Sequence, residues 1–510
     1  MFPVRKDFTE DLQRGEPEAG AVPLLGPASR LPAFPPPASR LYISGAMEDL
    51  TTGPLTRHLL KTTSFMLVTM IFQTLYFLID LYWVGRLGTH AIAAVGIAGN
   101  FTFIVLALTQ MLGVGTTTVV SHAVGRKNRD EAELMFNQAQ VLAVVTGAGF
   151  LIVAMLVRLP YARALSPDTE TAALAGQYLL WFIPAMALQF LMVAAGAALR
   201  AVGNFKAGMI VSTGSVLINM VLAPFLIFGW GTGRAFGVAG AAMSSLIAVV
   251  VAVVWFATYF LPKKSYLRFV RADLKPRLAL WRKMLSIGLP SGFEFAMMGV
   301  YLVVVYSIAR PFGAAAQAGF GIGQRVIQAM FMPAVALGFS VAPVAGQNFG
   351  ARSRERVVDT FRKAAYMVTA VMALLIILCL TAPHALIGVF SKDPAVLAVG
   401  TEYLRIASWN FIASGLIFVA SSMFQAMGNT VPSLVASGTR ILLVSVPAIL
   451  LSRTAGFQLN WIWYLSVGAV LIQLTISMLL LRREFRRRLT FPSQPKLDNT
   501  AFASAMVAAE

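Results

Sequence analysis

Two carboxylates stand well inside apolar stretches of this sequence, Asp80 and Glu294, whereas the other acidic residues fall in termini, loops or the edges of such stretches. An ionised carboxylate in an apolar environment is costly unless it is paired, hydrated or protonated. A protein retains such a group mainly where it has a function. We therefore expect Asp80 and Glu294 to bind and release H⁺ or Na⁺, and the alternative for each is a structural hydrogen bond to a neighbouring Gln, Asn or Tyr.

Polar side chains accompany the first of these carboxylates. Gln73, Tyr76 and Asp80 are spaced i, i+3 and i+7, so they share one face of a helix. A polar stripe on an otherwise apolar helix predicts a face turned toward the interior of a helix bundle. Asn219 lies in another apolar stretch, and we expect it either to bind the same ion or to form an interhelical hydrogen bond.

Two arginines lie in apolar stretches that follow the one containing Glu294. Arg325 and Gln328 share a face of one apolar stretch, and Arg440 lies in a later one. Either arginine is a candidate ion-pair partner for Glu294. Together with Tyr76, these three residues are our candidates for a substrate-lining surface.

Other kinds of chemistry find little support. The single cysteine, Cys379, excludes a disulfide framework, and the four histidines are scattered singly, so we expect no metal site. The sequence has no phosphate-binding G-x-x-x-x-G-K-[ST] motif and no Ser/His/Asp set. We expect neither an enzyme nor a bound cofactor, and the energy for any transport should come from an ion gradient.

The composition indicates a polytopic membrane protein. Of 510 residues, 57% are hydrophobic and 12% are charged, against about 25% charged in soluble domains. A bilayer span needs roughly 20 apolar residues, and its backbone must satisfy its own hydrogen bonds, which favours helices. The sequence therefore predicts an all-α protein with twelve transmembrane helices, near 62–84, 91–118, 134–157, 172–198, 208–229, 237–260, 284–309, 315–344, 364–383, 398–424, 433–452 and 460–481.

The basic residues predict the orientation. The net charge is +19, and 31 of the 41 Lys and Arg fall on one side of the predicted spans, against 7 on the other. An excess of Lys and Arg marks the cytoplasmic side, so this charge does not call for a nucleic-acid partner. We expect a multi-pass plasma-membrane protein, the inner membrane in a bacterium, with both termini in the cytoplasm.

Three segments flank or join the predicted spans. Residues 1–56 are rich in Pro, Ala and Gly and are predicted to be a disordered cytoplasmic segment, in which Met47 is a plausible alternative start. Residues 261–283 form a basic linker, interpreted either as an interfacial amphipathic helix or as a charged connection. Residues 483–510 form a basic cytoplasmic tail.

The chain matches itself without gaps at one constant offset of 225 residues, which we call the repeat offset. Gly125 corresponds to Gly350, and the same offset relates Ala201-Val-Gly-Asn204 to Ala426-Met-Gly-Asn429. The repeat predicts two pseudo-symmetric six-helix bundles, an N-lobe over 57–260 and a C-lobe over 284–482. Two such bundles around a central cleft are an architecture of transporters.

Several motifs resemble those of multidrug and toxic compound extrusion (MATE) transporters. They are the stretch from Gln73 to Gly88, Met332-Pro333, Gly346-Gln-Asn-Phe-Gly-Ala351, the stretch from Asn219 to Ala242, and Gln425-Ala-Met-Gly-Asn-Thr430. The resemblance covers about residues 57–485. It implies cation or drug efflux coupled to H⁺ or Na⁺, with Asp80 matching the acidic residue of the N-lobe.

Three positions depart from this pattern. Ala223 stands where the family often has Asp, Phe65 stands opposite Pro290 where the first helix often has Pro, and Glu294 lies one turn before the acid position of some relatives, occupied here by Met298. The loss of a second N-lobe acid leaves Asp80 to act alone or with Asn219 and Gln73.

From these observations we predict a monomeric antiporter in the lipid bilayer that exports hydrophobic, cationic small molecules by alternating access. The first alternative is a flippase for a lipid-linked saccharide or lipid, whose pyrophosphate would suit Arg325 and Arg440. A membrane receptor or scaffold without transport is the second alternative, and a flux assay separates it from both transporters.

Overall fold

The computed structural model describes residues 47–231, 233–261 and 265–491, and within these ranges the fold is helical with no β-strand. The predicted disorder of residues 1–46 and the predicted tail over 492–510 lie outside the described residues. The prediction of disorder is wrong for residues 47–56, because Leu50 is fully buried and the first helix begins at Leu55. Residues 483–488 likewise belong to the last helix.

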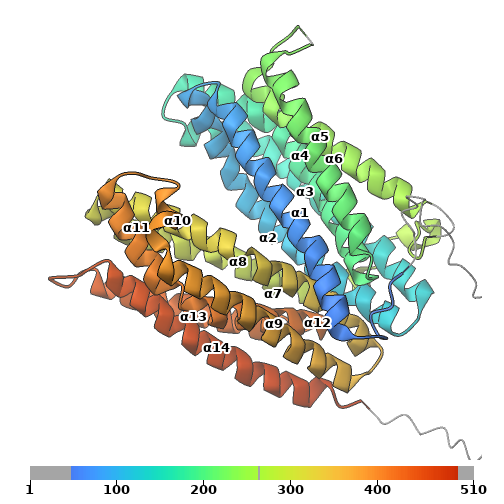
Figure 1. Ribbon diagram of the computed structural model, residues 1–510. Helices are drawn as coiled ribbons and strands as arrows, with labels where there is room; N and C mark the ends of the chain where they lie inside the picture. Colours follow the sequence, from blue (N-terminus) through green and yellow to red (C-terminus); the bar gives the residue numbers. More distant parts are fainter. Residues whose placement is uncertain (1–46, 232, 262–264, 492–510) are drawn as a thin grey trace, which may run out of the picture. The chain divides into compact units, whose positions relative to one another are not determined.

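The first repeat contains six long helices (Figure 1). They are α1 (Leu55–Gly85), α2 (Thr89–Gly125), α3 (Arg129–Leu165), α4 (Thr169–Ala201), α5 (Phe205–Phe228) and α6 (Gly237–Phe260). Within this repeat α4 packs against α2, α3 and α6, and α1 packs against α5.

The second repeat has the same order with shorter pieces. Its elements are η1 (Arg271–Leu274), α7 (Leu278–Ala309), η2 (Arg310–Phe312), α8 (Ala314–Gly350), α9 (Arg354–Thr381), α10 (Pro383–Gly388), α11 (Pro394–Ala407), α12 (Asn410–Ala426), α13 (Val431–Leu451) and α14 (Asn460–Arg488). Eleven helices in the described ranges are long and apolar enough to cross a membrane, and α11 with α12, bent by 54°, supplies a twelfth. The prediction of an all-α protein with twelve spans is confirmed.

The repeat is visible in the backbone. Helices α2 and α8 begin and end at positions related by the repeat offset, and the turns that follow them contain Lys127 and Arg352, non-glycine residues with φ of 59° and 58°. Gly88 and Gly313, related by the same offset, have φ of 103° and 87°, a region that favours glycine. The two repeats therefore share their local turns as well as their helix order.

The first helix of each repeat begins in the hydrophobic core of the other repeat. Leu55 and Leu59 of α1 pack in a cluster built mainly from α8, α9 and α12. Met284 and Ile287 of α7 pack in the cluster built mainly from α2, α3 and α4. Because the repeat offset relates Leu59 to Met284, this exchange is reciprocal.

The basic linker packs on α3. Glu133, whose side chain is 5% exposed, forms ion pairs with Arg129 and Arg268, both at 3.0 Å. Asn137 donates to the carbonyl of Arg268 at 2.8 Å, and Gln138 accepts from the backbone N–H of Arg277 at 2.8 Å. Before α7 begins at Leu278, the described part of the linker has one helical turn, η1, so these contacts favour a docked connection over an interfacial amphipathic helix.

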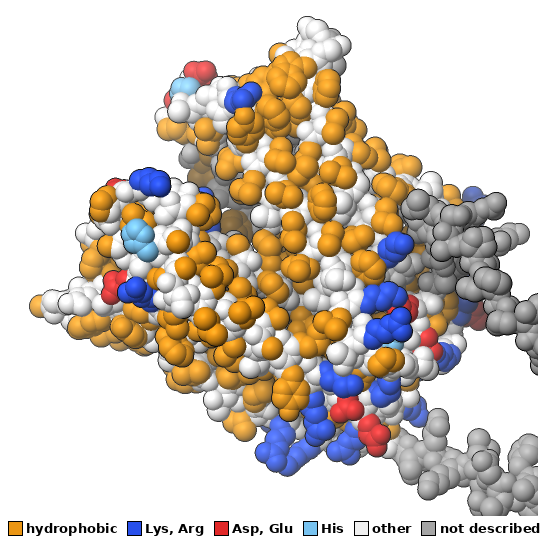
Figure 2. Space-filling model, in the orientation of Figure 1, with side chains coloured by type: hydrophobic (Ala, Val, Ile, Leu, Met, Phe, Trp, Pro, Cys, Tyr) orange, Lys and Arg blue, Asp and Glu red, His pale blue; other side chains and the backbone are white. Residues whose placement is uncertain are grey.

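Basic side chains gather at one end of the helices, which we call the basic end. It comprises the segments 126–129, 200–206, 265–283, 352–363 and 482–488. On the face shown in Figure 2, most Lys and Arg lie toward this end, whereas hydrophobic side chains cover the lengths of the helices. Such an apolar girdle is what a lipid-facing surface requires.

Candidate ion-coupling site

A cluster of hydroxyl and amide groups joins α1, α5 and α6. Asn219 on α5 is 3% exposed, and its Nδ2 donates to Ser244 Oγ at 3.3 Å and Ser245 Oγ at 3.1 Å. Tyr76 on α1 shares a hydrogen bond of 3.0 Å between its hydroxyl and Ser245 Oγ. Tyr76 lies on the inward face of α1, as its helical spacing predicts. There it bonds to Ser245 of α6, which also accepts from the amide of Asn219 on α5.

Asp80 lies one helical turn after Tyr76 on the same helix. Its Oδ1 is buried and makes no hydrogen bond to any described residue. Ser244 and Ser245 donate to the carbonyl of Ala241 at 2.8 Å and 3.2 Å. Because a carboxylate oxygen without a donor is unfavourable in an apolar environment, the Oδ1 atom of Asp80 retains an unused capacity to accept a hydrogen bond.

Two further positions of the first repeat bear on the cluster. Gln73 is exposed, so it does not share the buried environment of Asn219. Ala223, one turn after Asn219, is 1% exposed and brings no polar group to the site. The structure therefore brings together Tyr76, Asn219 and the α6 serines, with Asp80 one helical turn from Tyr76, but leaves out Gln73.

The second carboxylate has a different environment. Glu294 on α7 accepts hydrogen bonds from Ser433 Oγ at 2.9 Å and from Ser437 Oγ at 2.6 Å, both on α13. Gln473 of α14 donates to Ser437 Oγ at 3.1 Å, and Ser421 Oγ of α12 lies 2.8 Å from Ser433 Oγ. Both carboxylate oxygens of Glu294 are thus occupied inside the second repeat.

The predicted partners of Glu294 are not in contact with it. No ion pair among the described residues joins it to Arg325 or Arg440. Arg325 and Gln328 are exposed on α8, and Arg440 lies over the ring of Tyr301 with 5.6 Å between its guanidinium carbon and the ring centroid. The prediction of a Glu294–arginine pair is wrong, because serine hydroxyls one turn apart on α13 reach the carboxylate instead.

Sequence reasoning missed the serines of both clusters. Ser433 and Ser437 are four residues apart in an apolar helix, and Ser244 and Ser245 are adjacent in another. The i, i+4 spacing of Ser433 and Ser437 puts both hydroxyls on one helix face, and this could have been noticed as a pair of donors for a buried acid. Serine is common in membrane helices, however, so the pattern carries weight only once the acid that faces it is known.

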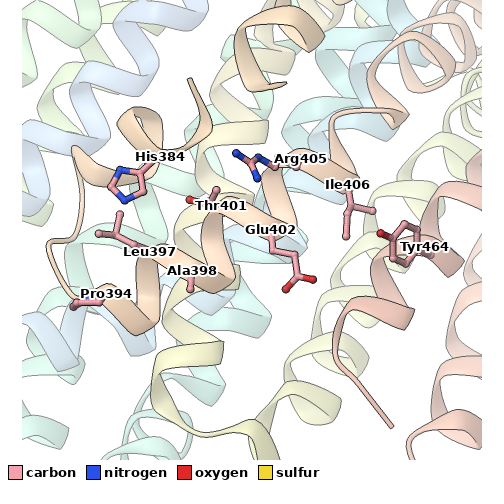
Figure 3. A pocket seen from close by; sticks show the side chains of 9 residues that line it. All are labelled: His384, Pro394, Leu397, Ala398, Thr401, Glu402, Arg405, Ile406 and Tyr464. Atoms are coloured by element: carbon pink, nitrogen blue, oxygen red, sulfur yellow. The ribbon is translucent and has the colours of Figure 1, made fainter. Parts of the chain in front are cut away.

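One groove among the described residues lies apart from both clusters. It has a volume of about 630 Å³ and is lined by residues of α10, α11 and α14, including His384, Glu402, Arg405 and Tyr464 (Figure 3). In Figure 3 the side chains of Glu402 and Arg405 extend in different directions. Since no residue of the first repeat lines it, this groove is not the place where the two repeats could share a substrate.

Metal chemistry has no visible support in the described ranges. No group of three or more His, Cys, Asp or Glu there could hold a metal ion. The polar clusters instead consist of hydroxyl, amide and single carboxyl groups that bond to one another.

The comparison with protein families matches both repeats. The sequence model of the MatE family matches residues 66–225 and 290–450, one stretch in each repeat. The chain belongs to the MatE family. Members of this family are membrane transporters, so this MatE protein is a transporter and not an enzyme, as the motifs predicted.

Curated relatives of this MatE protein extend over most of its length. A probable multidrug resistance protein YoeA of Bacillus subtilis is 25% identical over 78% of this chain and 87% of its own. A multidrug export protein MepA of Staphylococcus haemolyticus is 27% identical over 71% and 80%. A FAD transporter of Shewanella oneidensis is 24% identical over 78% and 88%.

Solved structures share its fold. An outward-facing conformation of a multidrug resistance MATE family transporter of the MOP superfamily matches with a TM-score of 0.80 and 22% identity over 87% of this chain and 98% of that one. A MOP superfamily transporter from Pyrococcus furiosus, described as having a binding pocket of reverse polarity, matches with the same scores and coverage. At this identity the likeness supports the fold alone.

Proposed function

We propose that this MatE protein is an antiporter that uses an H⁺ or Na⁺ gradient to export hydrophobic, cationic small molecules by alternating access. The observation that carries the proposal is the buried Oδ1 of Asp80, which has no hydrogen-bond donor among the described residues. A transporter that couples two movements needs a group whose charge changes during the cycle, and a carboxylate inside a span is such a group.

The geometry suggests how Asp80 acts. When it is ionised, its negative charge lies within one helical turn of the Tyr76 ring, and a cationic substrate would gain from both. Binding of H⁺ or Na⁺ removes that attraction, so the substrate and the ion compete for one charge. Asn219 bonds to Ser244 and Ser245 and so ties α5 to α6, while Ser245 also bonds to Tyr76 of the helix that carries Asp80.

The contacts between repeats support alternating access. At the basic end, α2 approaches α7 and α8 closely: a Cβ on Gly115 would lie 2.7 Å from the carbonyl oxygen of Met284, and Gly125 has room only for hydrogen beside the carbonyl of Gln347. Such an arrangement suits a carrier that is closed at its basic end. We infer that this end faces the cytoplasm of a plasma membrane, with both termini there, since Lys and Arg concentrate on that side.

The names of the curated relatives favour drugs as substrates. Two of them are called multidrug resistance or multidrug export proteins. We extend this to hydrophobic cations because an anionic residue in an apolar, aromatic environment selects for them. A monomer is sufficient for this mechanism, since both repeats lie in one chain.

Uptake into inverted membrane vesicles tests the proposal. A fluorescent lipophilic cation is offered while a proton gradient or a sodium gradient is imposed separately, and wild type is compared with Asp80→Asn. Uptake under one gradient that Asp80→Asn abolishes would support the antiporter and identify the ion. Equal uptake by Asp80→Asn, or no uptake under either gradient by folded wild type, would contradict it.

A second candidate function is transport of an anionic, pyrophosphate-bearing molecule or lipid. It is favoured by Arg440, whose buried Nε makes no hydrogen bond to a described residue, and by the exposed Arg325. The Shewanella relative is called a FAD transporter, and FAD carries a pyrophosphate. Transport of FAD or a lipid-linked pyrophosphate that Arg440→Gln abolishes, in vesicles that do not take up the cation, would favour this candidate.

A further inference from the structure

A short segment before α1 is seated on the second repeat. Leu50 is fully buried, its backbone N–H donates to Gln347 Oε1 at 3.0 Å, and its carbonyl accepts from Asn348 Nδ2 at 3.1 Å. Arg356 of α9 donates to the carbonyls of Leu50 and Gly53 at 3.3 Å and 3.1 Å. The side chain of Leu50 also packs in the core cluster of α8, α9 and α12.

The same segment is tied to the first repeat at its other end. The N–H of Glu48 donates to the carbonyl of Val202, after α4, at 3.1 Å. Asp49 forms an ion pair with Lys127, after α2. We call residues 48–53 the strap, because this short segment is bound to both repeats.

The strap adjoins one member of a symmetric pair of contacts between the repeats. His122 Nε2 donates to the carbonyl of Ala426 at 2.6 Å, and Gln347 Nε2 donates to the carbonyl of Ala201 at 2.8 Å. The repeat offset relates the two donors to each other and the two acceptors to each other. Gln347 differs from His122 in one respect, since its second polar atom, Oε1, is held by the N–H of Leu50.

We propose that the strap is a latch on the basic-end gate, which must leave its seat on α8 and α9 whenever that end opens. The proposal rests on the alternating access proposed above, because a gate has to open only in a protein that alternates. The strap bonds to Val202 and Lys127 in the first repeat and to Gln347, Asn348 and Arg356 in the second. The repeats can therefore separate at this end only if the strap gives up its bonds on one side, and the seat on α8 and α9 is the side that opens.

The chemistry of the strap suits reversible release. Its polar bonds to the second repeat are made by its backbone N–H and C=O groups, which water can satisfy when the strap leaves. Leu50 is its single fully buried side chain, and exposing one leucine is a moderate penalty that tertiary motion can overcome. The strap therefore biases the gate toward the closed state without making closure permanent.

Cysteine accessibility tests this directly. Ser121 of α2 is fully buried and faces Gly346 of α8 beneath the strap. On a background of Cys379→Ala, which removes the only native thiol, Ser121→Cys should react slowly with a water-soluble maleimide. Leu50→Ala should speed this reaction about tenfold, because truncating a buried leucine weakens the seat.

Two further variants keep the test sharp. Arg356→Gln removes the guanidinium bonds to the strap carbonyls and should also speed labelling, which covers the case in which Leu50→Ala does not fold. Lys61→Gln is the matched control, since Lys61 binds Glu48 at 2.8 Å from within the first repeat and makes no bond to the second. Its labelling rate should equal that of wild type.

Labelling is measured without substrate or gradient, so it is independent of the transport assay. Unchanged labelling in both Leu50→Ala and Arg356→Gln, or equal acceleration in Lys61→Gln, would overturn the strap proposal while leaving the antiporter intact. Accelerated labelling in a protein that transports no cation under either gradient would support the strap and count against the antiporter.

Discussion

The two buried carboxylates of this protein lie in opposite environments. Glu294 receives hydroxyl donors on both oxygens, at 2.9 Å and 2.6 Å. Asp80 has a buried oxygen without a donor from the described residues, although two serines and an asparagine lie in the same cluster and bind one another. A saturated acid is suited to a structural role, and an unsaturated acid is suited to exchanging a proton or cation.

The comparison also separates what the repeat preserves from what it does not. The basic end is symmetric down to paired contacts, such as those of His122 and Gln347. The acids are not symmetric, since the repeat counterpart of Asp80 is Val305 and that of Glu294 is Thr69. A duplicated scaffold therefore carries symmetric contacts at the basic end and an asymmetric polar interior.

The largest expected effect is on transport by variants of the two acids. Asp80→Asn should reduce gradient-driven cation uptake to the level of empty vesicles, because an amide cannot change its charge. Glu294→Gln keeps the size of the side chain and one acceptor oxygen, and its amide NH2 can donate to a serine hydroxyl that turns to accept, so its uptake should stay within about threefold of wild type. Equal loss of uptake in the two variants, at equal protein levels, would remove the distinction between the sites.

The next largest effect is on stability, when Glu294 loses its hydrogen-bond donors and so comes to resemble Asp80. A double variant Ser433→Ala and Ser437→Ala removes both donors and should lower the free energy of unfolding by roughly 1–3 kcal/mol for each lost partner. Chemical denaturation in detergent measures this. Ser244→Ala serves as the control in the first repeat, since it takes no donor from Asp80; a drop as large as that of the double variant would contradict the comparison.

At the basic end, equivalent substitutions in the two repeats should lower the stability by similar amounts. Gly125 and Gly350 lie where a Cβ would overlap a backbone carbonyl of the opposite repeat, so Gly125→Ala and Gly350→Ala should each destabilise the closed state by about 1–3 kcal/mol. Thermal unfolding and maleimide labelling at Ser121→Cys report it. Gly149→Ala, in open space on α3, is the control and should be neutral or stabilising. A large effect of only one of Gly125→Ala and Gly350→Ala would contradict the symmetry of the basic end.

The smallest effect concerns a helix cap that only one repeat has. Asn128 caps α3 by accepting the N–H of Glu131 at 3.1 Å, whereas its counterpart Ser353 makes no side-chain cap bond to α9. Asn128→Ala should cost about 1 kcal/mol, measured by the shift of the denaturation midpoint. Ser353→Ala should leave that midpoint nearly unchanged, and equal shifts would mean that the cap geometry does not matter here.

Much of the fold could be predicted from the sequence because hydrophobic length and the constant repeat offset are strong signals. The spans, the helical class and the duplication follow from them, and Asp80 stands out because an acid in an apolar helix is costly. These features depend on residue type and position in the sequence, so they can be recognised without knowing which residues lie nearby in the fold.

The rest depends on contacts between distant segments. The composition of the strap predicts disorder because it continues that of the Pro-rich segment, and its structure depends on bonds to distant residues such as Gln347, Asn348 and Arg356. Gln73 shares a helix with Asp80, yet its exposure depends on which helices cover that face. The serine partners of Glu294 follow from the packing of α7 on α13, which no local pattern encodes.

The most direct test of the account is ion movement driven by substrate in proteoliposomes. Adding a lipophilic cation to one side, with no gradient imposed, should drive H⁺ or Na⁺ the other way in wild type and in Glu294→Gln, and should drive none in Asp80→Asn. Ion movement of wild-type size in Asp80→Asn, or its loss in Glu294→Gln alone, would contradict the assignment of ion coupling to Asp80.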